Sequence, residues 1–116
     1  MNDPASPRHY ASGDLSLQTD DSGARFWAVA LKQSMLSYFE VPPDATFERH
    51  EHESEQITLV LEGSLDFRFD SHTVTVGAGE VVAVPSRIPH AVVAGPAGAR
   101  AVDAWSPVRS EYVTAR

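Results

Sequence analysis

The sequence predicts an all-β fold made of one domain. Runs of strand length are separated by Gly, Pro and Asp at intervals of about 8 to 12 residues, which is typical of a sandwich or barrel. Residues 65–69 and 73–76 alternate apolar and polar side chains with period 2, as a half-buried antiparallel strand does. Signals for helices are nearly absent, so we expect strands throughout.

The chain opens with an aperiodic segment and then becomes a series of strands. Residues 1–21 mix Pro, Ser, Gly and Asp, so we expect a tail that adds at most one strand to a domain spanning residues 22–116. Aromatic and β-branched residues fill the first runs, and turn pairs such as Pro42-Pro43, Glu62-Gly63 and Gly95-Pro96 separate the later ones. The expected strands are 26–31, 34–41, 56–61, 65–69, 73–76, 81–84, 91–94 and 100–105.

Length and composition restrict the partners. At 116 residues there is room for one hydrophobic core. The formal net charge of −7 makes nucleic acid and anionic membrane surfaces poor partners. No stretch approaches the ~20 apolar residues of a membrane span, and the N-terminus has no apolar run, so we expect a cytoplasmic protein. Without cysteine, any metal ion must be held by imidazole, carboxylate or amide groups.

Three candidate metal ligands lie close together in the sequence. His50, His52 and Gln56 are separated by even numbers of residues, so their side chains share one face if residues 49–60 form one extended strand. Imidazole nitrogens suit Zn, Ni, Fe, Mn or Cu alike. Glu55 is the alternative to Gln56, because a β-bulge would exchange the sides of these two residues. We favour Gln56.

A second motif, from Gly79 to His90, supports this interpretation. The sequence resembles the cupin family in two spaced motifs, His50-x-His52-x3-Gln56-x6-Gly63 and Gly79-x5-Pro85-x4-His90. The resemblance covers roughly residues 25–112 and implies a single cupin jelly-roll barrel in which neighbouring strands bring these ligands together. It also implies one divalent metal ion as cofactor, held by His50, His52, Gln56 and His90.

The chain departs from the family pattern at several positions. Ala94 replaces a frequent asparagine. Asp44 stands where the first motif usually opens with glycine, and Arg87 replaces the glycine that follows Pro85. Ser54 stands where related sequences often have a third histidine. Asp44 and Arg87 supply no ligand in the family, so these two departures concern the geometry of turns.

The C-terminal run of residues 102–112 is similar to the ending of small bacterial cupins that resemble the pectin-degradation cupin, which linearises unsaturated monouronates. The resemblance implies that Asp103, Trp105 and Arg109 act at the substrate. Asp103 and Trp105 share parity on one strand, so a general base and an aromatic wall can both face the interior. In the alternative, Trp105 is part of the core, Asp103 pairs with an arginine, and Arg109 forms a surface ion pair.

These features predict a metal-binding protein that acts on a small molecule. The expected function is that of a metal-dependent isomerase, lyase or cyclase, with a small oxygen-rich anion such as an unsaturated uronate as substrate. The motifs are also similar to those of cupin polyketide cyclases. Two alternatives stay open: an iron-dependent dioxygenase, and a non-catalytic module that binds a sugar or another metabolite.

Apolar side chains beyond those that one small barrel must bury predict a homodimer. We expect the N-terminal tail to be able to cross to the partner. The side chains expected on this surface are Phe26, Leu36, Val41, Leu59 and Leu61.

Overall fold

The protein is an all-β barrel, as the sequence predicts. The computed structural model describes residues 6–114, so residues 1–5 of the expected tail and residues 115–116 of the expected domain lie outside the described part. The elements in chain order are β1 (Gln18–Thr19), β2 (Arg25–Ala30), β3 (Met35–Val41), β4 (Thr46–His50), β5 (Glu55–Phe69), β6 (Thr73–Gly77), β7 (Val81–Val84), β8 (His90–Ser106) and the 3₁₀ helix η1 (Ser110–Tyr112).

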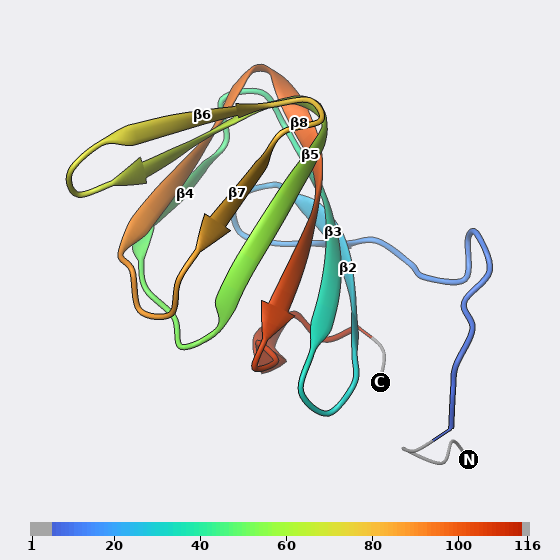
Figure 1. Cartoon of the computed structure of the whole chain (residues 1–116). Coiled ribbons are helices and arrows are strands. Elements are labelled where there is room, and N and C mark those ends of the chain that lie inside the picture. The colour runs from blue at the N-terminus through green and yellow to red at the C-terminus, as the bar shows by residue number, and fades with distance from the viewer. Residues whose placement is uncertain (1–5, 115–116) are drawn as a thin grey trace.

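The strands form one antiparallel sheet that curves around a single interior (Figure 1). The hydrogen-bonded order is β1-β2-β3-β8-β5-β6, with β4 paired to β8 and β7 paired to β5. The long strands β5 and β8 pair with each other along most of their length and therefore join the two halves of the barrel.

Two pairs of expected strands are continuous in the structure. The runs 56–61 and 65–69 are both part of β5, and 91–94 and 100–105 are both part of β8. Gly63 and Gly98 have φ angles of +72° and +73°, and a Cβ on Gly63 would lie 1.9 Å from the carbonyl oxygen of Gly98. The turn signals at these glycines therefore mark bends where two strands cross closely, and not chain reversals.

The tail adds a short edge strand, as the sequence allows. In β1, Gln18 pairs with Phe26 of β2, whereas the segment before β1 runs away from the barrel (Figure 1). The guanidinium of Arg8 donates a hydrogen bond to the carbonyl of Ala30, 2.8 Å away. Within residues 6–114, no helix has the length and hydrophobicity needed to span a membrane.

The core consists of the inward positions of the strands. Phe67 and Val60 are almost completely buried, and the Phe39 ring stacks on Phe26 at 5.2 Å between centroids. The expectation that Phe26 and Val41 lie on an exposed surface is wrong: only 5% and 7% of these residues is exposed. Both occupy inward positions of the alternation in β2 and β3, where their burial stabilises the barrel.

The two non-glycine departures from the family pattern keep a glycine-like backbone. Asp44 has a φ angle of +60° and Arg87 a φ angle of +66°. This left-handed region brings Cβ close to the backbone and costs ~1–2 kcal/mol for most residues, although Asp tolerates it better. The turns therefore keep their geometry, and Arg87 is strained.

We expect Arg87→Gly to stabilise the protein by about 0.5–1 kcal/mol, because relief of the φ strain exceeds the entropy that glycine adds to the unfolded chain. Asp44→Gly is the matched comparison and should change stability less. Urea unfolding of both variants at neutral pH measures the effect. A lower midpoint for Arg87→Gly than for the wild type would contradict it.

Candidate metal centre

The segment that carries the first three candidate ligands is not one strand. β4 ends at His50, residues 51–54 form a connection, and β5 begins at Glu55, so residues 49–60 do not meet the condition of one extended strand under which the shared face was expected. Burial nevertheless keeps the expected parity across the connection. His52 and Gln56 are buried, whereas Glu55 is exposed.

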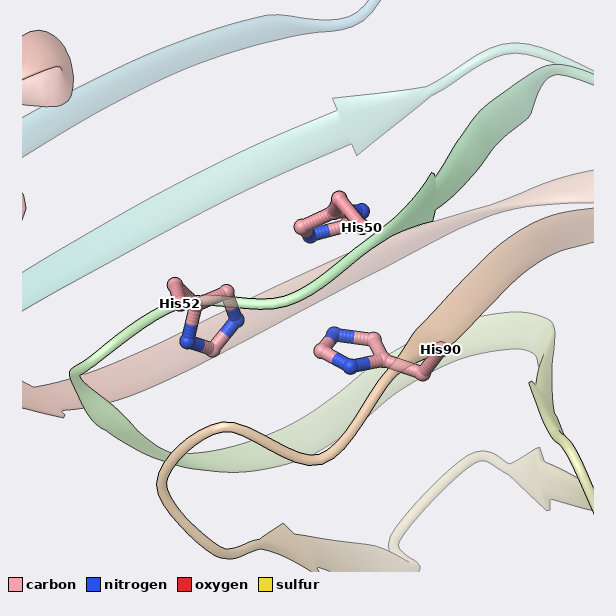
Figure 2. Close-up of side chains that lie close together, drawn as sticks. All are labelled: His50, His52 and His90. Carbon is pink, nitrogen blue, oxygen red and sulfur yellow. The ribbon is translucent and has the colours of Figure 1, made fainter.

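Three histidines converge inside the barrel (Figure 2). His50 lies at the end of β4, His52 in the following connection and His90 at the start of β8, where it pairs with His50. One ring nitrogen of each lies within 4.8 Å of those of the other two. The structure therefore brings together the histidines of both sequence motifs.

Backbone carbonyls orient all three rings. The Nδ1 atoms of His50, His52 and His90 lie 2.7, 2.8 and 2.8 Å from the carbonyl oxygens of Glu48, Ser54 and Ile88, respectively. A carbonyl oxygen can only accept, so each Nδ1 carries the proton and donates it. Each Nε2 is then left with a free lone pair, which is the form in which histidine binds a metal ion.

Burial keeps two of these rings neutral. The pKa values of His52 and His90 are lowered from the usual value of histidine, chiefly because burial penalises the charged imidazolium. His90 is only 1% exposed. At neutral pH both rings are therefore available as ligands without the loss of a proton.

Gln56 presents its amide oxygen to this cluster. Its Oε1 lies 3.1 Å from Nε2 of His52, while its Nε2 donates to the Thr58 hydroxyl at 2.9 Å and to Asp103 at 3.4 Å. Because the Nδ1 of His52 already holds the ring proton, two lone pairs face each other across this gap. Such an arrangement is stabilised by a cation between the two atoms.

Asp103 lies next to Gln56 and is enclosed by hydroxyl groups. Thr58 donates to its Oδ1, and Ser37 donates to its Oδ2 at 3.1 Å. Its pKa is raised to about 6, because burial disfavours the carboxylate more than these hydrogen bonds favour it. Within residues 6–114, Asp103 forms no ion pair with an arginine, in contrast to the structural alternative considered for it.

The raised pKa makes the stability of the metal-free protein depend on pH. The folded state binds a proton at Asp103 more readily than the unfolded chain, whose Asp pKa is about 3.9, so acidification stabilises the fold relative to a variant without this group. Between about pH 7.5 and pH 5 we expect wild type to gain ~1.5 kcal/mol over Asp103→Asn. Urea unfolding of both proteins in EDTA measures the difference, and equal pH slopes would contradict it.

Trp105 belongs both to the core and to the wall of the site. Its indole Nε1 donates to Ser37 at 2.8 Å, and the side chain packs with Met35 in a buried cluster. Its ring also meets that of His52 edge to face, with 5.3 Å between centroids. Trp105 therefore contacts the His52 ring and also fixes the Ser37 hydroxyl, which donates to Asp103.

Arg109 lies over two neighbouring aromatic rings. The guanidinium carbon is 5.2 Å from the Trp105 ring centroid and 4.8 Å from that of Tyr112. Nε and Nη2 bind Glu111 at 2.8 and 2.7 Å. The ion pair considered as the structural alternative is therefore present, but the stacked side chain is largely buried and lines the interior.

A cavity with a free volume of about 60 Å³ connects these groups. Its polar lining comes from His50, Gln56, His90, Asp103 and Arg109, and most of the remaining lining is apolar or aromatic. A groove on the outside shares Phe47, His50, Arg109 and Tyr112 with the cavity, and we call it the mouth groove. The acidic residues of this groove are Asp20, Asp21, Glu48 and Glu51.

Three residues of the site were not predicted from the sequence. Thr58 lies two residues after Gln56 and faces inward like it, and Ser37 occupies an inward position of β3. The signal in the sequence was a polar residue at a strand position where an apolar one is expected. Ser54 is buried and holds His52 through its carbonyl, while its hydroxyl donates to the carbonyl of Pro107. Ser54 therefore positions a ligand although it supplies none itself.

A small all-β barrel with a convergent histidine cluster in its interior defines the class of protein. Residues 37–105, more than half of the chain, match the family described as Cupin domain. The protein belongs to the cupin family, as the two sequence motifs predict. A comparison with curated proteins found no match.

Solved structures with the same fold include several cupins. An RmlC-like cupin from Shewanella frigidimarina has a TM-score of 0.83 at 23% identity, covering 92% of this chain and 97% of the other. KdgF from Halomonas sp. has a TM-score of 0.83 at 20% identity, with 91% and 98% covered. The polyketide cyclase RemF from Streptomyces resistomycificus has a TM-score of 0.75 at 24% identity, with 88% and 80% covered. At these identities, the similarity shows the fold alone.

Proposed function

We propose that the protein holds one divalent metal ion on His50, His52, Gln56 and His90, and that it is a metal-dependent enzyme. The observation that carries the proposal is the orientation of the three rings, whose Nδ1 protons are bound to carbonyls while the Nε2 lone pairs remain free. The donors are three imidazoles and one amide oxygen, a neutral set that suits Zn, Ni, Fe, Mn or Cu.

A bound ion would act as a Lewis acid that polarises a substrate oxygen. Asp103 lines the same cavity, and its carboxylate exchanges a proton at Oδ1 or Oδ2 near neutral pH, as a general base requires. Trp105 forms an aromatic wall. Glu111 occupies Nε and Nη2 of Arg109, which leaves Nη1 to bind a substrate oxygen.

The substrate we propose is a small oxygen-rich anion such as an unsaturated uronate, and the reaction an isomerisation, elimination or cyclisation. The resemblance of residues 102–112 to the pectin-degradation cupins supports the uronate, and the resemblance of the two sequence motifs to those of cupin polyketide cyclases supports the reaction class. A free volume of about 60 Å³ holds only part of such a molecule, so the rest would lie in the mouth groove.

The matched variants Gln56→Ala and Glu55→Ala test the ligand set. We expect Gln56→Ala to lose most of its metal and Glu55→Ala to keep it, because the Glu55 side chain is exposed and Gln56 faces His52. Elemental analysis of the purified proteins measures this. Full metal in Gln56→Ala would remove Gln56 from the ligand set, and loss in Glu55→Ala would replace it with Glu55.

An assay of the wild-type protein with an unsaturated uronate measures the reaction. The ultraviolet absorbance of the double bond is followed over time. Loss of absorbance at a rate that depends on enzyme and metal supports the proposal. Iron in the elemental analysis together with oxygen uptake would instead support a dioxygenase.

The charge of the mouth favours a second candidate, a non-catalytic module that binds a neutral sugar or another metabolite. Four carboxylates line the outer groove. Its two arginines are already paired, Arg49 with Asp70 and Arg109 with Glu111. These carboxylates disfavour the approach of an anion. Calorimetric binding of a neutral sugar without turnover of any uronate would support this candidate.

A further inference from the structure

Three polar side chains lie in one row across the inner face of the barrel. Ser37 of β3 is the register partner of Asp103 of β8, and Asp103 is the register partner of Thr58 of β5. Gln56 and Trp105 are partners in the next inward row. Directly paired residues have Cβ atoms ~4.5–5.5 Å apart, so the strand register brings these five buried side chains together.

The direction of each hydrogen bond in this group follows from the donors. An indole N–H can only donate, so Ser37 accepts from Trp105 at 2.8 Å, and its own proton goes to Oδ2 of Asp103 at 3.1 Å. In the same way, Thr58 accepts from Nε2 of Gln56 at 2.9 Å and gives its proton to Oδ1 of Asp103. Two chains of hydrogen bonds therefore end on one carboxylate, one from the indole and one from the amide.

The Thr58 hydroxyl decides which way round the Gln56 amide lies. The oxygen and the NH2 group of an amide have almost the same shape, so the hydrogen-bond partners distinguish the two orientations. As the amide lies, its NH2 group donates to Thr58 and to Asp103, and its oxygen faces Nε2 of His52 at 3.1 Å. In the reverse orientation, the oxygen would face two acceptors, the carboxylate and a hydroxyl whose proton is already given to that carboxylate.

Loss of the Thr58 hydroxyl would favour the reverse orientation. The remaining contact of the amide with Asp103 is long, at 3.4 Å, and correspondingly weak. A reversed NH2 group could donate to the free lone pair on Nε2 of His52, which is the lone pair that a metal ion requires. An ion would then have to break this hydrogen bond and turn the amide before it could bind.

We propose that Thr58 is a positioning residue, which holds the Gln56 amide with its oxygen toward the metal ion and links this ligand to Asp103. This role rests on the metal site proposed above. It accounts for a threonine that is only 1% exposed in the core of β5, where valine has nearly the same shape. A buried hydroxyl is favourable only when its hydrogen bonds are made, and both bonds of this one serve residues of the site.

The ion affinity of Thr58→Val measures the contribution of the hydroxyl. We expect Zn²⁺ to bind ~10–100-fold more weakly than to wild type in competition with a chromophoric chelator, since loss of a group that orients a ligand has effects of this size. Thr58→Ser keeps the hydroxyl and should restore most of the affinity. Thr75→Val is the matched control, because it removes a hydroxyl that donates to Asp66 away from the cavity. Its affinity should equal that of wild type.

A double-mutant cycle with Gln56→Ala separates positioning from packing. Because Thr58 acts through the amide, Thr58→Val should change the affinity by less than ~2-fold when residue 56 is already alanine. Far-UV circular dichroism verifies that each variant folds. An equal loss of affinity in both backgrounds would overturn the proposal.

NMR of the ion-free wild type tests the orientation of the amide without any variant. Nuclear Overhauser contacts of the Gln56 NH2 protons should be stronger to Thr58 than to the His52 ring, and the opposite pattern would overturn the proposal. Wild type that binds no ion would overturn the proposed metal site and this role together. Wild type that binds the ion no more tightly than folded Thr58→Val would overturn this role alone.

Discussion

Replacement of His90 with alanine is expected to weaken the binding of a divalent ion by at least ~100-fold, and to remove most of the thermal stabilisation that the ion provides. His90 joins the second sequence motif to the first, since it pairs with His50 across β4 and β8. Without its Nε2, the remaining donors come only from residues 50–56.

The size of the thermal effect follows from binding linkage. An ion present at about 100 times its dissociation constant stabilises the folded state by ~2.7 kcal/mol, which raises the melting temperature of a domain of this size by roughly 10 °C. Melting curves of wild type and His90→Ala, with Zn²⁺ or with EDTA, measure this difference.

His72→Ala is the matched control for this experiment. His72 is exposed in the connection between β5 and β6, away from the cluster, so its removal should leave the metal-dependent shift unchanged. An equal shift in wild type and His90→Ala would show that the ion binds elsewhere.

Asp103→Asn is expected to reduce turnover of a uronate substrate by ~10²–10⁴-fold while the metal content is retained. Asparagine has nearly the same shape, and its one carbonyl oxygen can accept from the hydroxyl of Thr58 or of Ser37, while its NH2 group faces the other hydroxyl. It cannot take up a proton near neutral pH, so the variant separates proton transfer from packing.

Asp66→Asn provides the matched comparison on the same sheet. Asp66 accepts a hydrogen bond from Thr75 at 2.7 Å at a half-buried position of β5, and it does not line the cavity. Its variant should retain full turnover. Turnover at the wild-type rate in Asp103→Asn, with metal bound, would leave Asp103 with a purely structural role.

Much of the fold was predictable because alternation and turn residues are local signals. The inward parity of Gln56, Asp103 and Trp105 follows from their spacing, and each is buried. The continuity of β5 and β8 was not predictable, since the role of Gly63 depends on the close approach of Gly98, which lies far away in the sequence.

The partners of the site residues were less accessible to sequence reasoning. Ser37 and Asp103 are neighbours because β3 pairs with β8, a long-range register that local patterns do not determine. The position of Ser54 beside the His52 ring depends on the irregular connection between β4 and β5. Hydrogen bonds of this kind depend on tertiary structure, so the spacing of residues in the sequence does not predict them.

The placement of β8 has a consequence for biosynthesis. This last strand pairs with β3, β4 and β5, and it carries His90 at its first residue. The barrel therefore cannot close until β8 has been synthesised, and domains generally fold as units. His90 is thus expected to reach its place beside His50 late in folding, only when β8 pairs with β4.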